Sequence, residues 1–297
     1  MKKIVLLFAA LLGTLGAYGQ DVKKMKVENG GSGPYKAVMV TDATLSTHTV
    51  FKPEDMSSFN ESNPIPVLVW GNGACTDSPW EHVNFLNEIA SHGFFVVAIG
   101  VMPEKLYERV DVGMSPSSKM TDAINWVISQ NANPQSQYYG KLDVWNLAAA
   151  GMSCGGLQTL DVAKDPRIST IMICNSGLFN KSNAGTAVPG MPMPEKERLA
   201  EIHCPVIYIL GGPEDIAYAN GMDDFAKINH VPVFAANYPV GHGGTYAKQY
   251  GGEFAVVAVS WLKWQLKSDA AAGKMFRGNP CGLVSRKGWT ADKKNIP

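Results

Sequence analysis

One stretch of the chain decides its fold: LDVWNLAAAGMSCGGLQTLDVA, residues 142–163. Its first part, Leu142–Ala149, is typical of a buried strand, and its last part, Leu157–Ala163, is typical of a helix. Between them lies the motif G-x-S-x-G, with Ser153 at its centre. Glycines at a strand-to-helix turn let the two elements approach closely while the central serine projects from the end of the strand. The stretch therefore predicts a strained, accessible serine at the carboxyl end of a strand.

Outward from this stretch, strands and helices alternate. Continuous apolar runs predict further strands at Val67–Trp70, Phe94–Ile99, Ile168–Cys174, Val206–Leu210 and Val231–Tyr238. Amphipathic runs predict a helix that begins at Ser78, with Glu81 closing a capping box, and further helices at Met120–Ser129, Asp223–Ile228 and Phe254–Gln265. This alternation predicts an α/β fold, in which helices cover both faces of a mostly parallel sheet.

The length of 297 residues fits a single large domain, which we place at residues 20–297. Residues 20–34 are polar and glycine-rich, so we expect a flexible lead-in there. The connection 175–204 is too long for a simple loop between a helix and a strand, and is a candidate cap or lid over a site. The C-terminal tail, residues 268–297, is polar and has no predicted structure.

Composition excludes several classes of protein. Hydrophobic residues make up 45% of the chain and charged residues 18%, which is typical of a globular protein rather than a disordered or fibrous one. The chain has 26 Lys and Arg residues and 26 Asp and Glu residues, so it lacks the excess of basic residues that is typical of a protein that binds nucleic acid. The five cysteines lack the spacing of a zinc site. We therefore expect no metal and no nucleic-acid partner.

The N-terminus predicts export. Lys2 and Lys3 precede the apolar run 4–15, and the small residues Ala17 and Gly19 have the spacing that a signal peptidase accepts. Residues 1–19 are thus predicted to be a signal peptide; the alternative is an uncleaved anchor. No later apolar run is long enough to span a membrane. The expected mature protein is secreted or periplasmic, has no membrane anchor and can form disulfides.

A reactive serine needs a base, and the base needs an acid that orients it. Asp215 and Glu214 both follow the strand Val206–Leu210, and the position of Asp215 fits that loop better. His242 lies in a glycine-flanked loop after the strand Val231–Tyr238, whereas the other five histidines flank or lie on predicted elements. The order serine, acid, histidine is the order required when the serine lies on such a strand–turn–helix.

With these three residues in this order, the chain resembles the α/β-hydrolase superfamily. The segment 89–97, IASHGFFVV, is similar to the helix–strand segment of dienelactone-hydrolase-like and cutinase-like polyester hydrolases. The resemblance covers roughly residues 35–266 and implies an α/β-hydrolase fold and a serine esterase without a cofactor. Polyester hydrolases usually carry G-W-S-M-G, where this chain has Met152 and Cys154 on either side of Ser153.

An oxyanion hole needs two backbone N–H donors. One is expected at Cys154, directly after the serine, and the other at Ala74 or Cys75, between which the sequence does not decide. Trp80, Met152 and Tyr246 lie near predicted strand ends and are candidates for an apolar substrate pocket. Further candidates for its wall are Leu178, Phe179, Met191 and Met193.

Cys75 and Cys154 lie on two loops that should leave the same edge of the sheet from neighbouring strands. In an oxidising compartment this placement predicts a disulfide between them. Cys174 and Cys204 are a poorer pair, because Cys174 ends one strand and Cys204 begins the next. They should therefore lie at opposite edges of the sheet. The alternative is that Cys75 and Cys154 are both free thiols.

The sequence therefore predicts an exported carboxylic-ester hydrolase that acts on a small or polymer-linked ester through Ser153, His242 and Asp215 and an acyl-enzyme. A peptidase or amidase with the same three residues is one alternative. A non-catalytic binding protein of the same fold is another. The sequence leaves the acyl and alcohol specificity and the oligomeric state open.

Overall fold

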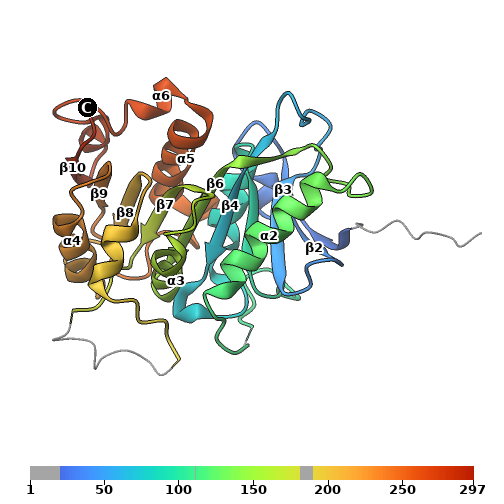
Figure 1. Cartoon of the computed structure of the whole chain (residues 1–297), viewed down its shortest axis with the longest axis horizontal. Coiled ribbons are helices and arrows are strands. Elements are labelled where there is room, and N and C mark those ends of the chain that lie inside the picture. Colours follow the sequence, from blue (N-terminus) through green and yellow to red (C-terminus); the bar gives the residue numbers. More distant parts are fainter. Residues whose placement is uncertain (1–20, 111, 181–189) are drawn as a thin grey trace, which may run out of the picture.

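The computed structural model describes residues 21–110, 112–180 and 190–297 (Figure 1). The predicted signal peptide, residues 1–19, lies outside the described residues. The described strands form one ten-stranded sheet in the order β1-β2-β3-β5-β4-β6-β7-β8-β9-β10. The predicted α/β-hydrolase fold, with its mostly parallel sheet and covering helices, is confirmed.

Six neighbouring strands run parallel and form the centre of the sheet. They are β5 (Phe95–Ile99), β4 (Ile65–Gly71), β6 (Leu142–Met152), β7 (Ile168–Cys174), β8 (Val206–Leu210) and β9 (Val233–Asn237). Their residues are apolar on both faces because helices cover both sides. The register places Gly71 beside Gly151, and Met152 beside Cys174, so the carboxyl ends of β4, β6 and β7 meet at one edge.

Five longer helices enclose this sheet. Helices α1 (Val83–Ser91) and α5 (Gly252–Lys267) pack into one apolar core. On the opposite face, α2 (Ser118–Ala132), α3 (Cys154–Val162) and α4 (Tyr218–Lys227) pack into a second core, and Figure 1 shows α2 and α3 in front of the strands. The predicted start of the first helix is wrong. A short 3-10 turn, Trp80–His82, precedes α1, and the Ser78 hydroxyl donates to the carbonyl of Val101 instead of capping a helix.

The N-terminal lead-in is ordered, contrary to prediction. Strand β1 (Asp21–Met25) pairs antiparallel with β2 (Ala37–Asp42), which pairs with β3 (His48–Pro53), and β3 joins β5. The glycines of this segment serve close packing rather than flexibility. A Cβ at Gly33 would lie 2.2 Å from the carbonyl oxygen of Ser91, at the end of α1. The polar lead-in therefore extends the sheet.

The C-terminal tail also belongs to the fold. After α6 (Ala270–Gly273), the chain forms β10 (Thr290–Lys294), which pairs antiparallel with β9. Phe276 and Trp289 are buried in the tail, and the ring of Trp289 stacks on Tyr238. These two aromatic side chains explain why a segment of polar composition packs against the sheet edge.

The predicted cap, residues 175–204, is only partly described, because residues 181–189 lie outside the described set. Its two described flanks meet at the buried carboxylate of Asp224 on α4. The Leu178 N–H donates to one oxygen of Asp224 at 2.8 Å, and Lys196 forms an ion pair with the other. Burial raises the pKa of Asp224 to about 6 although Lys196 opposes this shift. That the segment acts as a cap stays a prediction.

Candidate active site

Ser153 lies at the sharp turn between β6 and α3, in a left-handed backbone conformation with φ of 54°. The glycines around it make the turn possible. A Cβ at Gly151 would lie 2.2 Å from the carbonyl oxygen of Gly155, and a Cβ at Gly155 would lie 2.1 Å from that of Gly71. Both distances exclude any larger residue. The turn therefore holds a strained serine at the carboxyl edge of the sheet.

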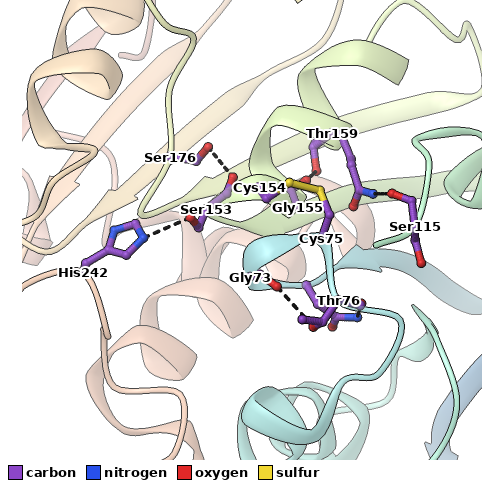
Figure 2. Close-up of a disulfide and its surroundings, with 12 residues drawn as sticks. Gly73, Cys75, Thr76, Ser115, Ser153, Cys154, Gly155, Thr159, Ser176 and His242 are labelled. Atoms are coloured by element: carbon purple, nitrogen blue, oxygen red, sulfur yellow. Dashed lines mark hydrogen bonds between the residues drawn. A yellow bond between two sulfur atoms is a disulfide. The ribbon is translucent and has the colours of Figure 1, made fainter. Parts of the chain in front are cut away.

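Three polar side chains form a hydrogen-bonded series at this edge. The Oγ of Ser153 is 3.0 Å from the Nε2 of His242, which lies in the loop after β9 (Figure 2). The Nδ1 of His242 is 2.6 Å from the Oδ1 of Asp215, which lies in the loop after β8. The structure thus brings together the serine, histidine and aspartate that the sequence singled out. Glu214, the alternative acid, is exposed to solvent.

The environment of Asp215 keeps its carboxylate ionised. Burial alone would raise its pKa, but the hydrogen bond with His242, together with donors from the backbone and Asn175, lowers the pKa below the ordinary value. The Ala217 N–H donates to Oδ1 at 2.9 Å, and the Gly211 N–H donates to Oδ2 at 3.0 Å. A buried, ionised acid behind the histidine ring suits the stabilisation of an imidazolium ion.

Asn175 is a site residue that the sequence reasoning missed. Its amide Nδ2 donates to the Oδ2 of Asp215 at 2.8 Å, and its Oδ1 accepts a hydrogen bond from the hydroxyl of Tyr246. Asn175 comes directly after β7, so the rule used for Asp215 and His242, inspection of the loop after each strand, could have found it. Tyr246 is buried, lines the pocket and also supports this network.

The loop after β4 lies beside the serine. The N–H of Cys75 donates to the carbonyl of Asn72 at 3.1 Å and is therefore occupied within the loop. Ala74 is exposed and lines the same pocket as Ser153 and Cys154. Of the two alternatives left open by the sequence, the Cys75 N–H is therefore already hydrogen-bonded, and Ala74 is the one that lines the pocket.

A disulfide joins Cys75 to Cys154, as predicted, with the Cα atoms 5.0 Å apart. Figure 2 shows it linking the loop after β4 to the first residue of α3, next to Ser153. The remaining cysteines, Cys174, Cys204 and Cys281, are buried free thiols. Burial raises the pKa of both Cys174 and Cys204 to about 12, which makes their thiols unreactive at neutral pH.

Reduction of the disulfide is expected to lower kcat about tenfold with a smaller change in KM, because the bond connects the two segments whose backbone N–H groups, at Ala74 and Cys154, we propose as oxyanion donors. It should also lower the free energy of unfolding by about 2–5 kcal/mol. Steady-state kinetics and urea unfolding, each with and without dithiothreitol, measure both effects. The double variant Cys75→Ala/Cys154→Ala is the control and should not respond to dithiothreitol. Equal sensitivity of both proteins would contradict this role.

A pocket of about 910 Å³ opens over Ser153 and His242. Its wall contains all three predicted substrate-binding residues, Trp80, Met152 and Tyr246. Of the further candidates, Phe179 and Met191 line the pocket, whereas Leu178 is buried in the core and Met193 lies outside the wall. The lining is mainly apolar, which suits an ester with an apolar or aromatic part.

His82 is a second residue whose place the sequence reasoning misjudged. We expected it on a helix face, but it is 2% exposed and lines the pocket. Its ring lies edge-on to both Trp70 and Tyr246, with centroid distances of 5.2 and 5.0 Å. Burial lowers the pKa of His82 to about 3, so the ring is neutral at neutral pH.

This burial predicts a loss of stability in acid. An unfolded histidine takes up a proton near pH 6.5, whereas folded His82 binds one only near pH 3. Between pH 7 and 5 this difference should lower the free energy of unfolding by about 2 kcal/mol. The variant His82→Phe keeps an aromatic ring between Trp70 and Tyr246. Between pH 7 and 5 its free energy of unfolding, measured in urea, should fall by about 2 kcal/mol less than that of the wild type. An identical pH dependence in the two proteins would refute the assignment.

Among the described residues, no group of three or more His, Cys, Asp or Glu side chains is arranged to hold a metal ion. In the same ranges, no helix is long and apolar enough to cross a membrane.

The strained serine on its glycine turn, the hydrogen-bonded histidine and the buried aspartate, set at the carboxyl edge of a parallel sheet, define the class as an α/β-hydrolase. The model of the PET hydrolase-like family matches residues 73–287, more than half of the chain, and the chain belongs to this family. It is therefore a serine ester hydrolase of the carboxylesterase type, and the resemblance to polyester hydrolases is confirmed. No curated protein matches the sequence.

Proposed function

We propose that this chain cleaves carboxylic esters with Ser153 as nucleophile, His242 as general base and Asp215 as the acid that orients His242. The hydrogen-bonded series from Ser153 Oγ through His242 to the Oδ1 of Asp215 carries this proposal. A peptidase would use the same three residues, and membership of the PET hydrolase-like family supports ester hydrolysis instead.

In the proposed reaction the Oγ of Ser153 attacks the ester carbonyl while the Nε2 of His242 takes the hydroxyl proton. Asp215 stabilises the resulting imidazolium through Nδ1. The same proton then passes to the leaving alkoxide, and an acyl-enzyme remains on Ser153. A water molecule then gives a proton to the Nε2 of His242 as it attacks the acyl carbonyl. The bond from that carbonyl to Oγ breaks and Oγ takes the proton from Nε2, which releases the carboxylic acid and restores Ser153.

The developing oxyanion is proposed to accept hydrogen bonds from the backbone N–H groups of Cys154 and Ala74. Cys154 is the first residue of α3, where backbone donors have no partner within the helix and the helix dipole favours negative charge. The disulfide from Cys154 to Cys75, the neighbour of Ala74, connects the two donor segments covalently. This link supports a fixed spacing between the donors.

The substrate is proposed to be an ester whose apolar or aromatic part packs against Trp80, Met152 and Tyr246. Family membership supports ester units of a polyester as one source of such groups. The small side chain of Ala74 beside Ser153 leaves space in the pocket for a bulky acyl group.

Export is proposed on two grounds: the sequence of residues 1–19, and the disulfide, because such bonds persist in oxidising compartments. Expression with the full N-terminus, followed by mass spectrometry of the exported protein, tests the predicted cleavage before Gln20.

Labelling with a fluorophosphonate, followed by peptide mass spectrometry, tests the nucleophile. The adduct is expected on Ser153 and nowhere else. Stopped-flow hydrolysis of 4-nitrophenyl esters tests the acyl-enzyme, which should give a burst of nitrophenol equal to the enzyme concentration when deacylation is slow. Labelling of another serine, or no labelling at all, would overturn the proposed mechanism.

A further inference from the structure

We propose that Glu81 makes the substrate pocket selective by charge, so that cationic esters are favoured over neutral ones and anionic esters are disfavoured. This inference rests on the proposed function and adds a specificity-determining residue to it.

Glu81 is the only carboxylate among the described residues that line the pocket, and none of those residues is Lys or Arg. The side chain is exposed, and the structure gives it no ion-pair partner within the described ranges. Its neighbour His82 is neutral at neutral pH because burial lowers the pKa of that ring to about 3. The negative charge of Glu81 therefore acts on any molecule that enters the pocket.

The Glu81 carboxylate lies near the loop that carries Gly73 and Ala74. A Cβ built on Gly73 would lie 3.5 Å from the Oε2 of Glu81 and 2.9 Å from the Sδ of Met152. Glu81 and Met152, the residue before Ser153, therefore both approach Gly73, which directly precedes Ala74. A charged group on a bound ester would lie in the same pocket as the Glu81 carboxylate and would interact with it electrostatically.

Aromatic side chains in the same wall add to the preference for positive charge. Trp80 and Phe179 are partly exposed in the pocket, and Tyr107 lies at its surface. The faces of aromatic rings attract a quaternary ammonium group, whereas they do not attract a carboxylate. One unpaired carboxylate together with aromatic rings is the chemistry that recognises an ester carrying an ammonium group.

The test uses three 4-nitrophenyl esters with acyl chains of equal length that end in a trimethylammonium, a tert-butyl or a carboxylate group. Ratios of kcat/KM are compared between enzyme variants, so the intrinsic reactivities of the esters cancel. Glu81→Gln should lower the cationic-to-neutral ratio and raise the anionic-to-neutral ratio, each about three- to tenfold. Glu81→Lys should reverse the order of preference. Both effects should shrink in 1 M salt, where the screening length is only about 3 Å.

Glu61→Gln is the matched control. It removes the same charge from an exposed residue that precedes β4, at the opposite edge of the sheet, and should leave all ratios unchanged. Ratios that stay constant in both Glu81 variants, or that change equally in the Glu61 variant, would overturn the proposal while leaving the ester hydrolase intact. If the wild-type protein cleaves none of the three esters and no probe labels Ser153, the proposed function fails as well.

Discussion

Replacing Ser153 with alanine is expected to lower kcat by at least about 10⁴-fold while the protein stays folded, since removal of a triad nucleophile typically costs that much or more. The substitution removes one hydroxyl, whose hydrogen bond is to His242. The backbone contacts of the turn do not involve that hydroxyl: the N–H of Ser153 donates to Cys174, and its carbonyl accepts from Ser176. The loss should therefore appear in kcat and not in stability.

Hydrolysis of a 4-nitrophenyl ester and thermal unfolding, both measured on the same preparation, check this expectation. Ser260→Ala is the control, because the hydroxyl of Ser260 lies on the exposed side of α5 and donates only to the carbonyl of Val256. Its activity should equal that of the wild type. Activity of the Ser153 variant within tenfold of wild type would refute the assignment of the nucleophile.

The second large effect is expected for Asp215→Asn, which should lower kcat about 10⁴-fold. All four hydrogen bonds at this carboxylate come from donors: His242 and Ala217 at Oδ1, Asn175 and Gly211 at Oδ2. An amide NH₂ would face a donor at either position. If the NH₂ lies at the Oδ1 position, the Nδ1 of His242 must lose its proton to accept from it, and the ring then holds the wrong tautomer for accepting the serine proton. If the NH₂ lies at the Oδ2 position, the buried N–H of Gly211 is left without an acceptor.

Glu214→Gln is the matched control for this variant, because it makes the same chemical change in the adjacent residue, whose side chain is exposed. We expect its kcat to remain within about twofold of wild type, because this exposed side chain takes no part in the hydrogen-bonded series from Ser153 to Asp215. The reverse ranking of the two variants would move the acid to Glu214 and would contradict the hydrogen bond between Asp215 and His242.

The elements closest to the site could be predicted because their signals are local. The strand and helix on either side of Ser153 and the glycines of the turn are set by neighbouring residues, so periodicity and backbone conformational preferences were sufficient. The loops that carry Asp215 and His242 come after continuous apolar strands, and the carboxyl ends of parallel strands share one edge. The same argument placed Cys75 near Cys154.

The errors came from segments whose packing partners are distant in the sequence. The glycines in residues 20–34 indicated flexibility, yet Gly33 packs against the end of α1. The tail gave no periodic signal, although Trp289 stacks on Tyr238 and holds β10 beside β9. Ser78 has the identity and spacing of a helix cap, but its hydroxyl finds a partner in Val101, beyond β5.

By itself, the sequence determined the fold class, the serine turn and the order of the three polar residues, because each depends on local pattern or on the direction of parallel strands. Only the tertiary structure decided which groups complete the site. Asn175 donates to Asp215 and accepts from Tyr246. The ring of His82 is buried between Trp70 and Tyr246. The N–H of Cys75 donates to the carbonyl of Asn72. These contacts join residues on different strands and loops. They depend on strand register and side-chain packing, which no local pattern records.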